Sequence, residues 1–248
     1  MLDDPNIIGI YKLVYQTIDF AAVREHFSSN LLKNLGIKHV QSFDSLPLYI
    51  RDVYRNTGKE KKKNKVLIAG SAAWLNLSMH LRDEKGNIEN YQSGIDFLIE
   101  YIDILNKKGY EVSFIMGAQA YPSQDDIEFL EYLKIRKAQI LLIEAKSLNE
   151  WLDHISEASL LVSGRFHHTI AAACLKTPFI LFNSNTPKTE ALAQYLNSEP
   201  LLQYQQTNLL EILLKRTDFL LSPSYENKQQ THSLETLSTL AIKNYEGL

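Results

Sequence analysis

The residues best suited to chemistry in this chain lie in one short segment, Ser163–Thr169, which reads Ser-Gly-Arg-Phe-His-His-Thr. The apolar run Ser159–Ser163 before it predicts a buried parallel strand, and Thr169–Leu175 after it predicts a packed helix. Arg165 and His167 are therefore expected between a strand end and a helix start, where open α/β sheets bind ligands. A guanidinium binds phosphate or carboxylate through paired hydrogen bonds, and an imidazole exchanges a proton near neutral pH. The segment predicts an anion site with acid–base capability.

A second polar turn is expected beside the first. Pro178–Phe182 predicts the next strand, and a polar stretch from Asn183 to Lys188 follows it. Lys188 begins a predicted helix, where a cation is unfavourable beside the helix dipole unless an anion is present. Glycine in the first turn allows a ligand to approach the strand end closely. The residues assigned to substrate binding at these two turns are Ser163, Gly164, Asn183 and Lys188.

The same residues could also have purely structural roles. Arg165 could pair with a carboxylate and His167 could cap a helix, but two adjacent anion-favouring strand ends favour a ligand site. His168 cannot readily point the same way as its neighbour, and we expect it to pack or cap. The chain has no Gly-x-Ser-x-Gly elbow of a serine hydrolase. No carboxylate or Cys pattern joins the histidines into a metal site, and no Gly-x-Gly-x-x-Gly or phosphate loop occurs.

Two further polar clusters follow predicted strands. Arg24, directly after the strand predicted over Phe20–Val23, lies where a ligand-facing loop is expected, and we assign it to substrate binding. The alternative is a plain helix start, with a serine as N-cap and Glu25 on the surface. The residues of the other cluster could line a ligand-binding cleft. Alternatively, Trp74 could lie in the core while the other members face solvent. Its members are Trp74, Asn76, Ser78, His80 and Arg82.

Strand and helix patterns alternate regularly through the second part of the chain, which predicts a doubly wound parallel sheet with right-handed crossovers. A further strand-and-helix pattern near the amino end predicts a smaller α/β lobe. The strands predicted for the large sheet are Val66–Ala69, Glu111–Met116, Gln139–Ile143, Ser159–Ser163 and Pro178–Phe182.

A lysine-rich segment divides the sequence. Five of the seven residues 59–65 are lysines, and such a run is typical of a solvated linker. We therefore expect a partial amino-terminal α/β lobe over residues 1–58 and a Rossmann-like carboxyl lobe over residues 66–248. The helices predicted over Leu209–Leu214 and Leu234–Ile242 are assigned to the carboxyl lobe.

Composition narrows the class of protein. The chain has 248 residues, is 45% hydrophobic and 22% charged, and has a net charge of −3, which gives no reason to expect nucleic-acid binding. Its single cysteine fits a reducing compartment. The amino terminus does not resemble a signal peptide, and no apolar run approaches the roughly 18 residues of a membrane span. We expect a cytoplasmic protein without an integral membrane segment.

These motifs together resemble the polysaccharide pyruvyl transferase family. The family's strongest motif is Ser-x-Arg-Leu-His at a strand end, followed by an alanine-rich helix, a strand begun by Pro and a turn with Lys. Here that motif is Ser163–His167, with Thr169–Leu175, Pro178–Phe182 and Lys188 after it. The amino-lobe pattern also matches, in Val23-Arg24-Glu25, Ser28 or Ser29, Leu32–Ile37 and Asp44. The resemblance covers residues 15–196 in order.

The resemblance implies a fold and an activity. Family members adopt a two-lobed fold like that of GT-B glycosyltransferases, and they transfer a pyruvyl group from phosphoenolpyruvate to sugar hydroxyls as a ketal. The donor would lie between the lobes, with Arg165 and Arg24 holding its phosphate and carboxylate. His167 would act as general acid. No metal or other cofactor is implied. The partners are the phosphorylated donor and a sugar acceptor of a cell-surface glycan, as in exopolysaccharide biosynthesis.

The chain departs from the family pattern in three ways. Phe166 replaces the usual Leu, Lys176 stands where Gly is customary, and the family's opening strand with its Asn-x-Gly-Asp-like loop is absent. If the chain is complete as given, we expect transfer to be weak or absent, because the acceptor would bind against the amino lobe and most of that lobe is missing. Two alternatives remain open: a GT-B-type glycosyltransferase that uses a nucleotide-activated sugar, and a non-catalytic relative that binds a glycan or a protein partner.

Overall fold

The computed structural model describes residues 5–55, 64–71, 96–117, 124–136, 138–184, 186–225 and 234–247. Contacts divide the chain into two compact units, Met1–Tyr54 with His232–Leu248 and Arg55–Thr231, and each is described by itself. The residues Trp74, Asn76, Ser78, His80 and Arg82 lie outside the described part of the chain. No helix in the described ranges has both the length and the apolar character that a membrane crossing requires.

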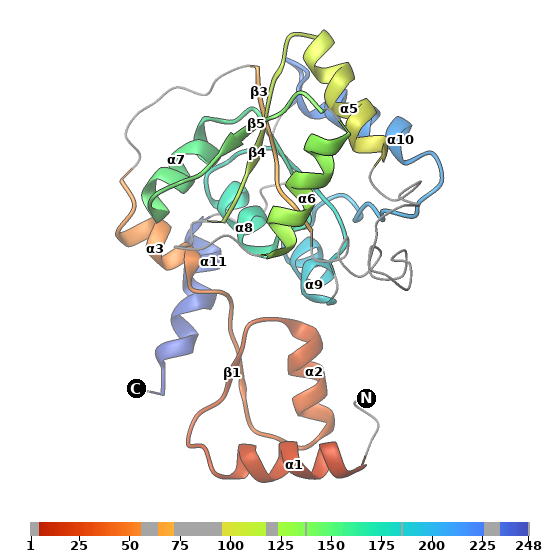
Figure 1. Ribbon diagram of the computed structural model, residues 1–248. Coiled ribbons are helices and arrows are strands. Elements are labelled where there is room, and N and C mark those ends of the chain that lie inside the picture. Colours follow the sequence, from red (N-terminus) through yellow and green to blue (C-terminus); the bar gives the residue numbers. More distant parts are fainter. Residues whose placement is uncertain are drawn as a thin grey trace. The chain divides into compact units, whose positions relative to one another are not determined.

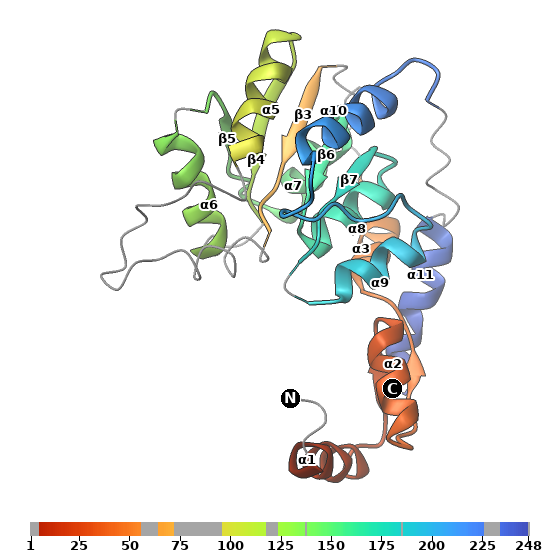
Figure 2. The same cartoon turned by 90° about the vertical axis from the view of Figure 1, so that its right-hand side faces the viewer.

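The larger unit contains the parallel sheet that the sequence predicts. Its five strands lie in the order β5-β4-β3-β6-β7, and every neighbouring pair is parallel. Figure 2 shows the strands in this order across the sheet. The doubly wound α/β fold class is therefore confirmed. The strands are β3 (Lys65–Ile68), β4 (Glu111–Ile115), β5 (Leu141–Ile143), β6 (Leu160–Ser163) and β7 (Phe179–Leu181).

Helices cover both faces of this sheet (Figure 1). Alternate strand residues point to opposite faces, and Val66, Ile68 and Phe114 share one core with residues of α5, α6 and α10. The helices α7 and α8 lie on the other side of the strands, and α9 packs against α8. The helices are α5 (Asp96–Lys107), α6 (Gln124–Ile135), α7 (Leu148–Glu157), α8 (Phe166–Cys174), α9 (Lys188–Tyr195) and α10 (Leu209–Leu220).

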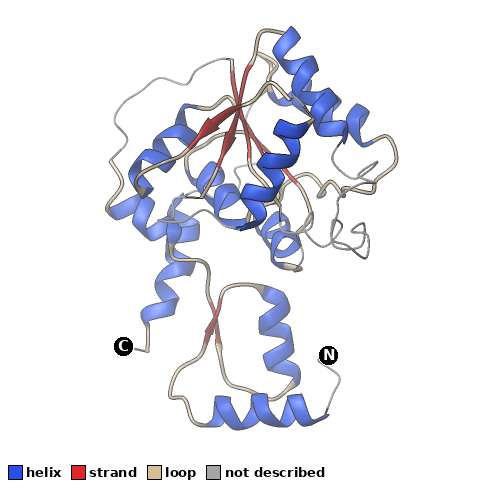
Figure 3. Cartoon of the chain, in the orientation of Figure 1, coloured by secondary structure: helices blue, strands red, loops and turns tan. Residues whose placement is uncertain are grey.

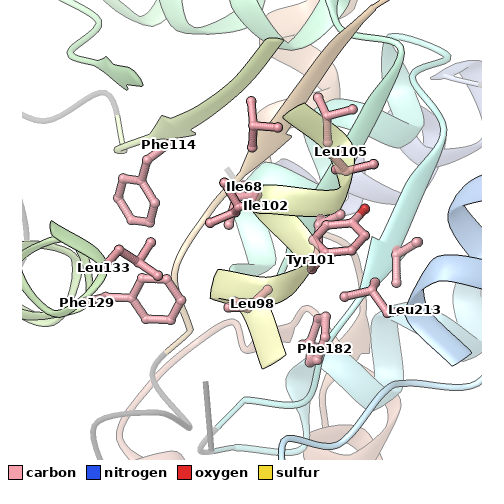
Figure 4. Packing of buried hydrophobic residues seen from close by; sticks show 14 of the residues in the cluster. Ile68, Leu98, Tyr101, Ile102, Leu105, Phe114, Phe129, Leu133, Phe182 and Leu213 are labelled. Carbon is pink, nitrogen blue, oxygen red and sulfur yellow. The ribbon is translucent and has the colours of Figure 1, made fainter. Parts of the chain in front are cut away.

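Aromatic and aliphatic side chains fill the core between the sheet and α5, α6 and α10 (Figure 4). Phe114 of β4 stacks on Phe129 of α6, with 5.6 Å between the ring centroids. Tyr101 of α5 is fully buried, and its hydroxyl is hydrogen-bonded to Thr217 Oγ1 of α10 at 2.7 Å. These contacts fix α6 on β4 and join α10 to α5.

The smaller unit contains a two-stranded parallel sheet of β1 and β2 (Figure 3). Its helix α3 was not predicted. The helix α11 packs against α3, so its residues belong to this unit rather than to the carboxyl lobe expected from the sequence. The elements are α1 (Pro5–Gln16), β1 (Ala22–Val23), α2 (His26–Asn34), β2 (Val40–Gln41), α3 (Leu46–Asp52), α11 (Leu234–Ile242) and the 3-10 turn η1 (Lys243–Tyr245).

The last residue of the predicted linker is part of the sheet. Lys65 begins β3 and is only 2% exposed. Its ammonium group lies 3.5 Å from Glu157 Oε2 and 3.2 Å from His154 Nδ1. A buried lysine requires a counter-charge, and Glu157 at the end of α7 supplies it.

The turn after α8 is closed by a residue in the left-handed region that is not glycine. Lys176 has φ of 60°, and its N–H donates to Ala173 O at 3.3 Å while the N–H of Thr177 donates to Ala172 O at 2.9 Å. This pattern is the Schellman ending, which favours glycine at the position that Lys176 occupies. The backbone therefore explains why glycine is customary there.

Candidate functional site

The strand order of the sheet reverses between β3 and β6, which lie side by side at its centre. The chain proceeds from β3 to β4 on one side and from β6 to β7 on the other. Ligands of open α/β sheets bind at the carboxyl ends of strands at such a reversal. Gly70 and Ser71 follow β3 there, and Gly164 and Arg165 follow β6. The predicted segment thus lies at the position in the sheet where a ligand is most expected.

The two turns are in close contact. The N–H of Gly164 donates to Gly70 O at 3.2 Å. A Cβ atom at Gly164 would lie 2.3 Å from both Cβ and Oγ of Ser71, so any larger residue would push the turns apart. We expected Gly164 to admit a ligand, and in the structure the space beside it holds Ser71.

Ser163 shapes the turn from which Arg165 emerges. Its hydroxyl is buried and accepts a hydrogen bond from the N–H of Arg165 at 2.9 Å. The carbonyl of Arg165 accepts from the N–H and the hydroxyl of Thr169, at 3.2 and 3.0 Å. The backbone of Arg165 is therefore fixed from both sides. Arg165 is also the N-cap of α8, and its side chain makes no capping hydrogen bond to the first turn.

The guanidinium of Arg165 is paired with a carboxylate that the sequence did not single out. Nη2 lies 2.6 Å and Nε 3.1 Å from Oδ1 of Asp126, near the start of α6. The side chain of Arg165 is 19% exposed and that of Asp126 is 6% exposed. The pairing with a carboxylate that we left open for Arg165 is therefore present, although this carboxylate is buried rather than on the surface.

The two histidines have different surroundings. His167, in the first turn of α8, is exposed, and its ring meets the ring of Phe166 edge to face, with 5.5 Å between the centroids. His168 is buried, and its Nε2 accepts the indole N–H of Trp151 at 3.2 Å. His168 therefore packs, as we expected, and His167 is the imidazole that solvent or a ligand reaches.

Asn183, directly after β7, joins the same group of turns. Its carbonyl accepts the hydroxyl of Ser71 at 2.8 Å, and Ser71 lies beside buried Tyr204. The side-chain oxygen of Asn183 is buried and receives no hydrogen bond within the described structure. A buried amide oxygen without a donor is unfavourable, so a ligand hydroxyl or a water molecule at this position would stabilise it.

Lys188 is half-buried and is the first residue of α9. Its N-cap is Pro187, which has no side chain able to cap the helix. The amino end of α9 therefore combines a helix dipole with a cation, as the sequence indicated.

Arg24 lies in the smaller unit and pairs there with Asp44, with 2.9 Å between Nη1 and Oδ2. Glu25, which we considered a surface residue, is buried and caps α2 by accepting from the N–H groups of Phe27 and Ser28 at 2.7 and 2.8 Å. Glu25 also contacts the hydroxyl of Ser28. The assignment of Arg24 to substrate binding stays a prediction.

Sequence reasoning missed Gly70, Ser71, Asp126 and Tyr204. The small residues Gly70 and Ser71 directly follow a predicted strand, and that position was a usable indication. Asp126 looked like an ordinary acidic residue near a helix start, which dipole interaction alone explains. Nothing in the sequence indicated Tyr204.

Comparisons with known proteins bear on the family and the fold of the chain. The family model for polysaccharide pyruvyl transferase matches residues 3–186. No curated protein sequence matches the chain. Among solved structures, UDP-GlcNAc 2-epimerase from Methanocaldococcus jannaschii has a TM-score of 0.55 at 15% identity, over 94% of this chain and 64% of that one. The same enzyme in complex with UDP-GlcNAc and UDP gives 0.54 at 15% identity, over 91% and 61%. The chain therefore spans less than two thirds of these neighbours, which have a GT-B-like fold.

Proposed function

Because the chain belongs to the polysaccharide pyruvyl transferase family, we propose that it transfers a pyruvyl group from phosphoenolpyruvate to hydroxyls of a sugar. One observation carries the proposal. Arg165 and the exposed His167 sit together where β6 ends and α8 begins, at the reversal of strand order. That position supplies a fixed cation, a helix amino terminus and a proton donor within three residues.

The donor is held through its negative charges. We assign the phosphate or carboxylate of phosphoenolpyruvate to Arg165, with the first turn of α8 beside it, because helix N–H groups and a guanidinium both favour anions. Lys188 at the start of α9 is assigned to a second charged group of the donor or the acceptor. Arg24 is assigned to donor binding by the family resemblance alone. The reaction needs no further cofactor, since phosphoenolpyruvate itself carries the activated group.

The chemistry begins with proton transfer to carbon. His167, as an imidazolium, donates a proton to the methylene carbon, and C2 becomes electrophilic. A sugar hydroxyl adds to C2 and loses its proton, which forms the first C–O bond. A second hydroxyl then displaces phosphate from C2 and closes the ketal. Of the two hydroxyl protons, one returns to His167 and replaces the proton given to the new methyl group, and the other leaves with inorganic phosphate, so the atoms balance. Fixed positive charge stabilises the departing phosphate.

Asn183 is assigned to a hydroxyl of the substrate. Its side-chain oxygen is buried and has no donor among the described residues, and a sugar hydroxyl is a donor of suitable size. Buried polar groups that lack a partner discriminate strongly for ligands that supply one. The proposed acceptor is a sugar of a cell-surface glycan, and the proposed location is the cytoplasm, where phosphoenolpyruvate is made.

The test is release of inorganic phosphate from phosphoenolpyruvate in the presence of a panel of sugar acceptors. We expect His167→Ala to lower turnover about 100-fold or more, the usual contribution of a general acid. We expect Arg165→Ala to weaken phosphoenolpyruvate binding by about 1.5–3 kcal/mol, the range for charge-assisted hydrogen bonds. Arg136→Ala, which removes a half-exposed arginine at the end of α6, serves as the control. Turnover that does not depend on His167 would contradict the mechanism.

A nucleotide-sugar enzyme is the second candidate. It is supported by the fold of UDP-GlcNAc 2-epimerase, one structure of which is a complex with UDP-GlcNAc and UDP. Arg165 and Lys188 would then hold a diphosphate. Thermal unfolding in the presence of UDP or of phosphoenolpyruvate separates the two candidates, because a ligand that binds only the folded chain raises its unfolding temperature as the ligand concentration rises. Binding of neither ligand would favour a non-catalytic relative.

A further inference from the structure

We infer that Asp126 is a positioning residue, which holds the guanidinium of Arg165 in the orientation that receives the anionic group of the donor. The inference rests on the proposed function and adds a residue to it from a different helix. Asp126 lies 39 positions before Arg165 in the sequence and is 4% exposed.

The geometry of the pair fixes the plane of the guanidinium. Both Nε and Nη2 of Arg165 are directed to the same oxygen, Oδ1 of Asp126, at 3.1 and 2.6 Å. A guanidinium is planar and carries five N–H donors. Once two of them are directed to one oxygen, the directions of the other three are set as well. A single contact to a terminal nitrogen would leave the group able to rotate.

The absence of a side chain at Gly70 leaves room for the carboxylate of Asp126. Gly70 follows β3 at the same end of the sheet, and a Cβ atom there would lie 2.5 Å from Oδ1 of Asp126 and 3.7 Å from Nη2 of Arg165. Any other residue at position 70 would displace the carboxylate. The pair is therefore seated directly over the end of a central strand.

The helix that carries Asp126 is firmly held. Phe129, Leu130 and Leu133 of α6 are buried in the core beneath the helix, and Phe129 stacks on Phe114 of β4. Figure 4 shows Phe129 and Leu133 directed toward Phe114. Because α6 is packed against the strands, the carboxylate is fixed relative to β6 and α8. Precise placement of a charged group by such supporting contacts increases its effect on a ligand.

Pairing with Asp126 lowers the net charge of the site but fixes the orientation of the Arg165 guanidinium. A guanidinium that is largely removed from water needs a counter-charge to stay favourable, and Asp126 supplies one while leaving Arg165 a cation. Arginine side chains lose considerable rotamer freedom when they are ordered. Because Asp126 orders Arg165 before any ligand arrives, an anion does not have to supply that ordering when it binds.

The inference is tested by measuring anion affinity in the intact chain with Asp126→Asn, Asp126→Glu and Gly70→Ala. The probes are inorganic phosphate and phosphoenolpyruvate, titrated by calorimetry into protein whose thermal unfolding has been recorded. Glu131→Gln, an exposed charge change on the same helix, is the matched control. We expect Asp126→Asn and Gly70→Ala to weaken both ligands about tenfold or more, the effect of one charge-assisted hydrogen bond. We expect Asp126→Glu to recover part of the loss and Glu131→Gln to change nothing.

A purely structural role for Asp126 would lower the unfolding temperature and leave the affinity of the folded protein unchanged, which would overturn the inference. Tighter binding in Asp126→Asn would also overturn it, since the carboxylate would then compete with the ligand. Steady-state kinetics add a second readout: we expect a higher KM for phosphoenolpyruvate with a smaller change in kcat.

The same titrations separate this inference from the proposed function. If the wild-type chain binds phosphate but neither binds nor turns over phosphoenolpyruvate, pyruvyl transfer is contradicted. The phosphate affinities of the variants still decide the role of Asp126 in that case. If the wild-type chain binds neither anion, both proposals are overturned.

Discussion

Trp151 of α7 donates its indole N–H to Nε2 of His168 on α8 at 3.2 Å, and the two rings meet edge to face with 4.8 Å between their centroids. Burial lowers the pKa of His168 to about 3, and the positive charge of Arg165 adds to this shift. Hydrogen bonding to the main chain of Met116 and Ile115 acts in the opposite direction. His168 is therefore a neutral ring that binds α7 to α8.

This burial predicts a loss of stability in mild acid. The pKa of His168 is lower in the folded chain than the 6.5 of an unperturbed histidine. Between these values the unfolded chain binds the additional proton, so the free energy of unfolding rises with pH. The contribution is complete above about pH 6.5 and decreases as the pH falls, by about 2 kcal/mol between pH 7 and pH 5 at 1.36 kcal/mol for each pKa unit.

Urea unfolding at several pH values measures this effect. We expect His168→Gln to be less stable than the wild type at pH 7 and to lose about 2 kcal/mol less between pH 7 and pH 5. His167→Gln, which changes the exposed neighbouring ring, is the control. An equal acid dependence in wild type and His168→Gln would contradict the assignment of a buried neutral ring.

The positive φ of Lys176 predicts a stabilising substitution. Lys176→Gly removes the strain of a side chain in the left-handed region, of order 1–3 kcal/mol, and loses part of it to the greater freedom of glycine in the unfolded chain. We expect the free energy of unfolding to rise by about 0.5–1 kcal/mol in chemical denaturation. Gly109→Lys is the reverse control, because Gly109 has φ of 84° and a Cβ there would meet no other atom within 4 Å. The free energy of unfolding of Gly109→Lys should fall by a similar amount.

The contact between Gly164 and Ser71 predicts that Gly164→Ala is both less stable and weaker in ligand binding. The added methyl group would lie 2.3 Å from Ser71 Oγ, and relief of such overpacking costs about 1–3 kcal/mol. The displaced turn also carries Arg165. Thermal unfolding and phosphoenolpyruvate titration measure the two effects. Gly9→Ala, where a Cβ would have no neighbour within 4 Å, is the control, and unchanged ligand affinity in Gly164→Ala would contradict the prediction.

The buried side-chain oxygen of Asn183 predicts a trade of stability against binding. In Asn183→Leu an amide oxygen that has no donor in the described part of the chain is replaced by an apolar group of similar size, which we expect to raise the free energy of unfolding by about 1 kcal/mol. Substrate affinity should fall at the same time. In the control Asn106→Leu, an amide that donates to Gln139 O at 2.8 Å is lost, and stability should decrease. A destabilised Asn183→Leu with normal affinity would argue against a ligand contact.

Much of the larger unit was predictable because its signals are local. Runs such as Leu160–Ser163 are buried on both faces of a parallel sheet and therefore read as continuous apolar strands. The motif around Arg165 was recognisable because strand, turn and helix adjoin in the sequence. The boundaries differed by only a few residues, as at Lys65, whose charge suggested a linker while its neutralisation by Glu157 depends on a residue 92 positions away.

The features that the sequence did not predict depend on contacts between segments that lie far apart in the sequence. No local pattern distinguishes Asp126 from other acidic residues near a helix start, because its role arises from Arg165 and from the absence of a side chain at Gly70. The helix α11 has an ordinary apolar pattern that fits either lobe. Its assignment was wrong because packing against α3 decides it.

The smaller unit is formed by two segments that lie far apart in the sequence, Met1–Tyr54 and His232–Leu248. This arrangement constrains the order in which the unit can fold during synthesis. Asn244 accepts the hydroxyl of Ser42 at 2.7 Å and donates to Phe43 O at 2.7 Å, across about 200 intervening positions. A ribosome must therefore complete the whole larger unit before these contacts can form. Until that point in synthesis, the segment that contains β1 and β2 lacks its contacts with Asn244, and it is then most exposed to proteases and to chaperones.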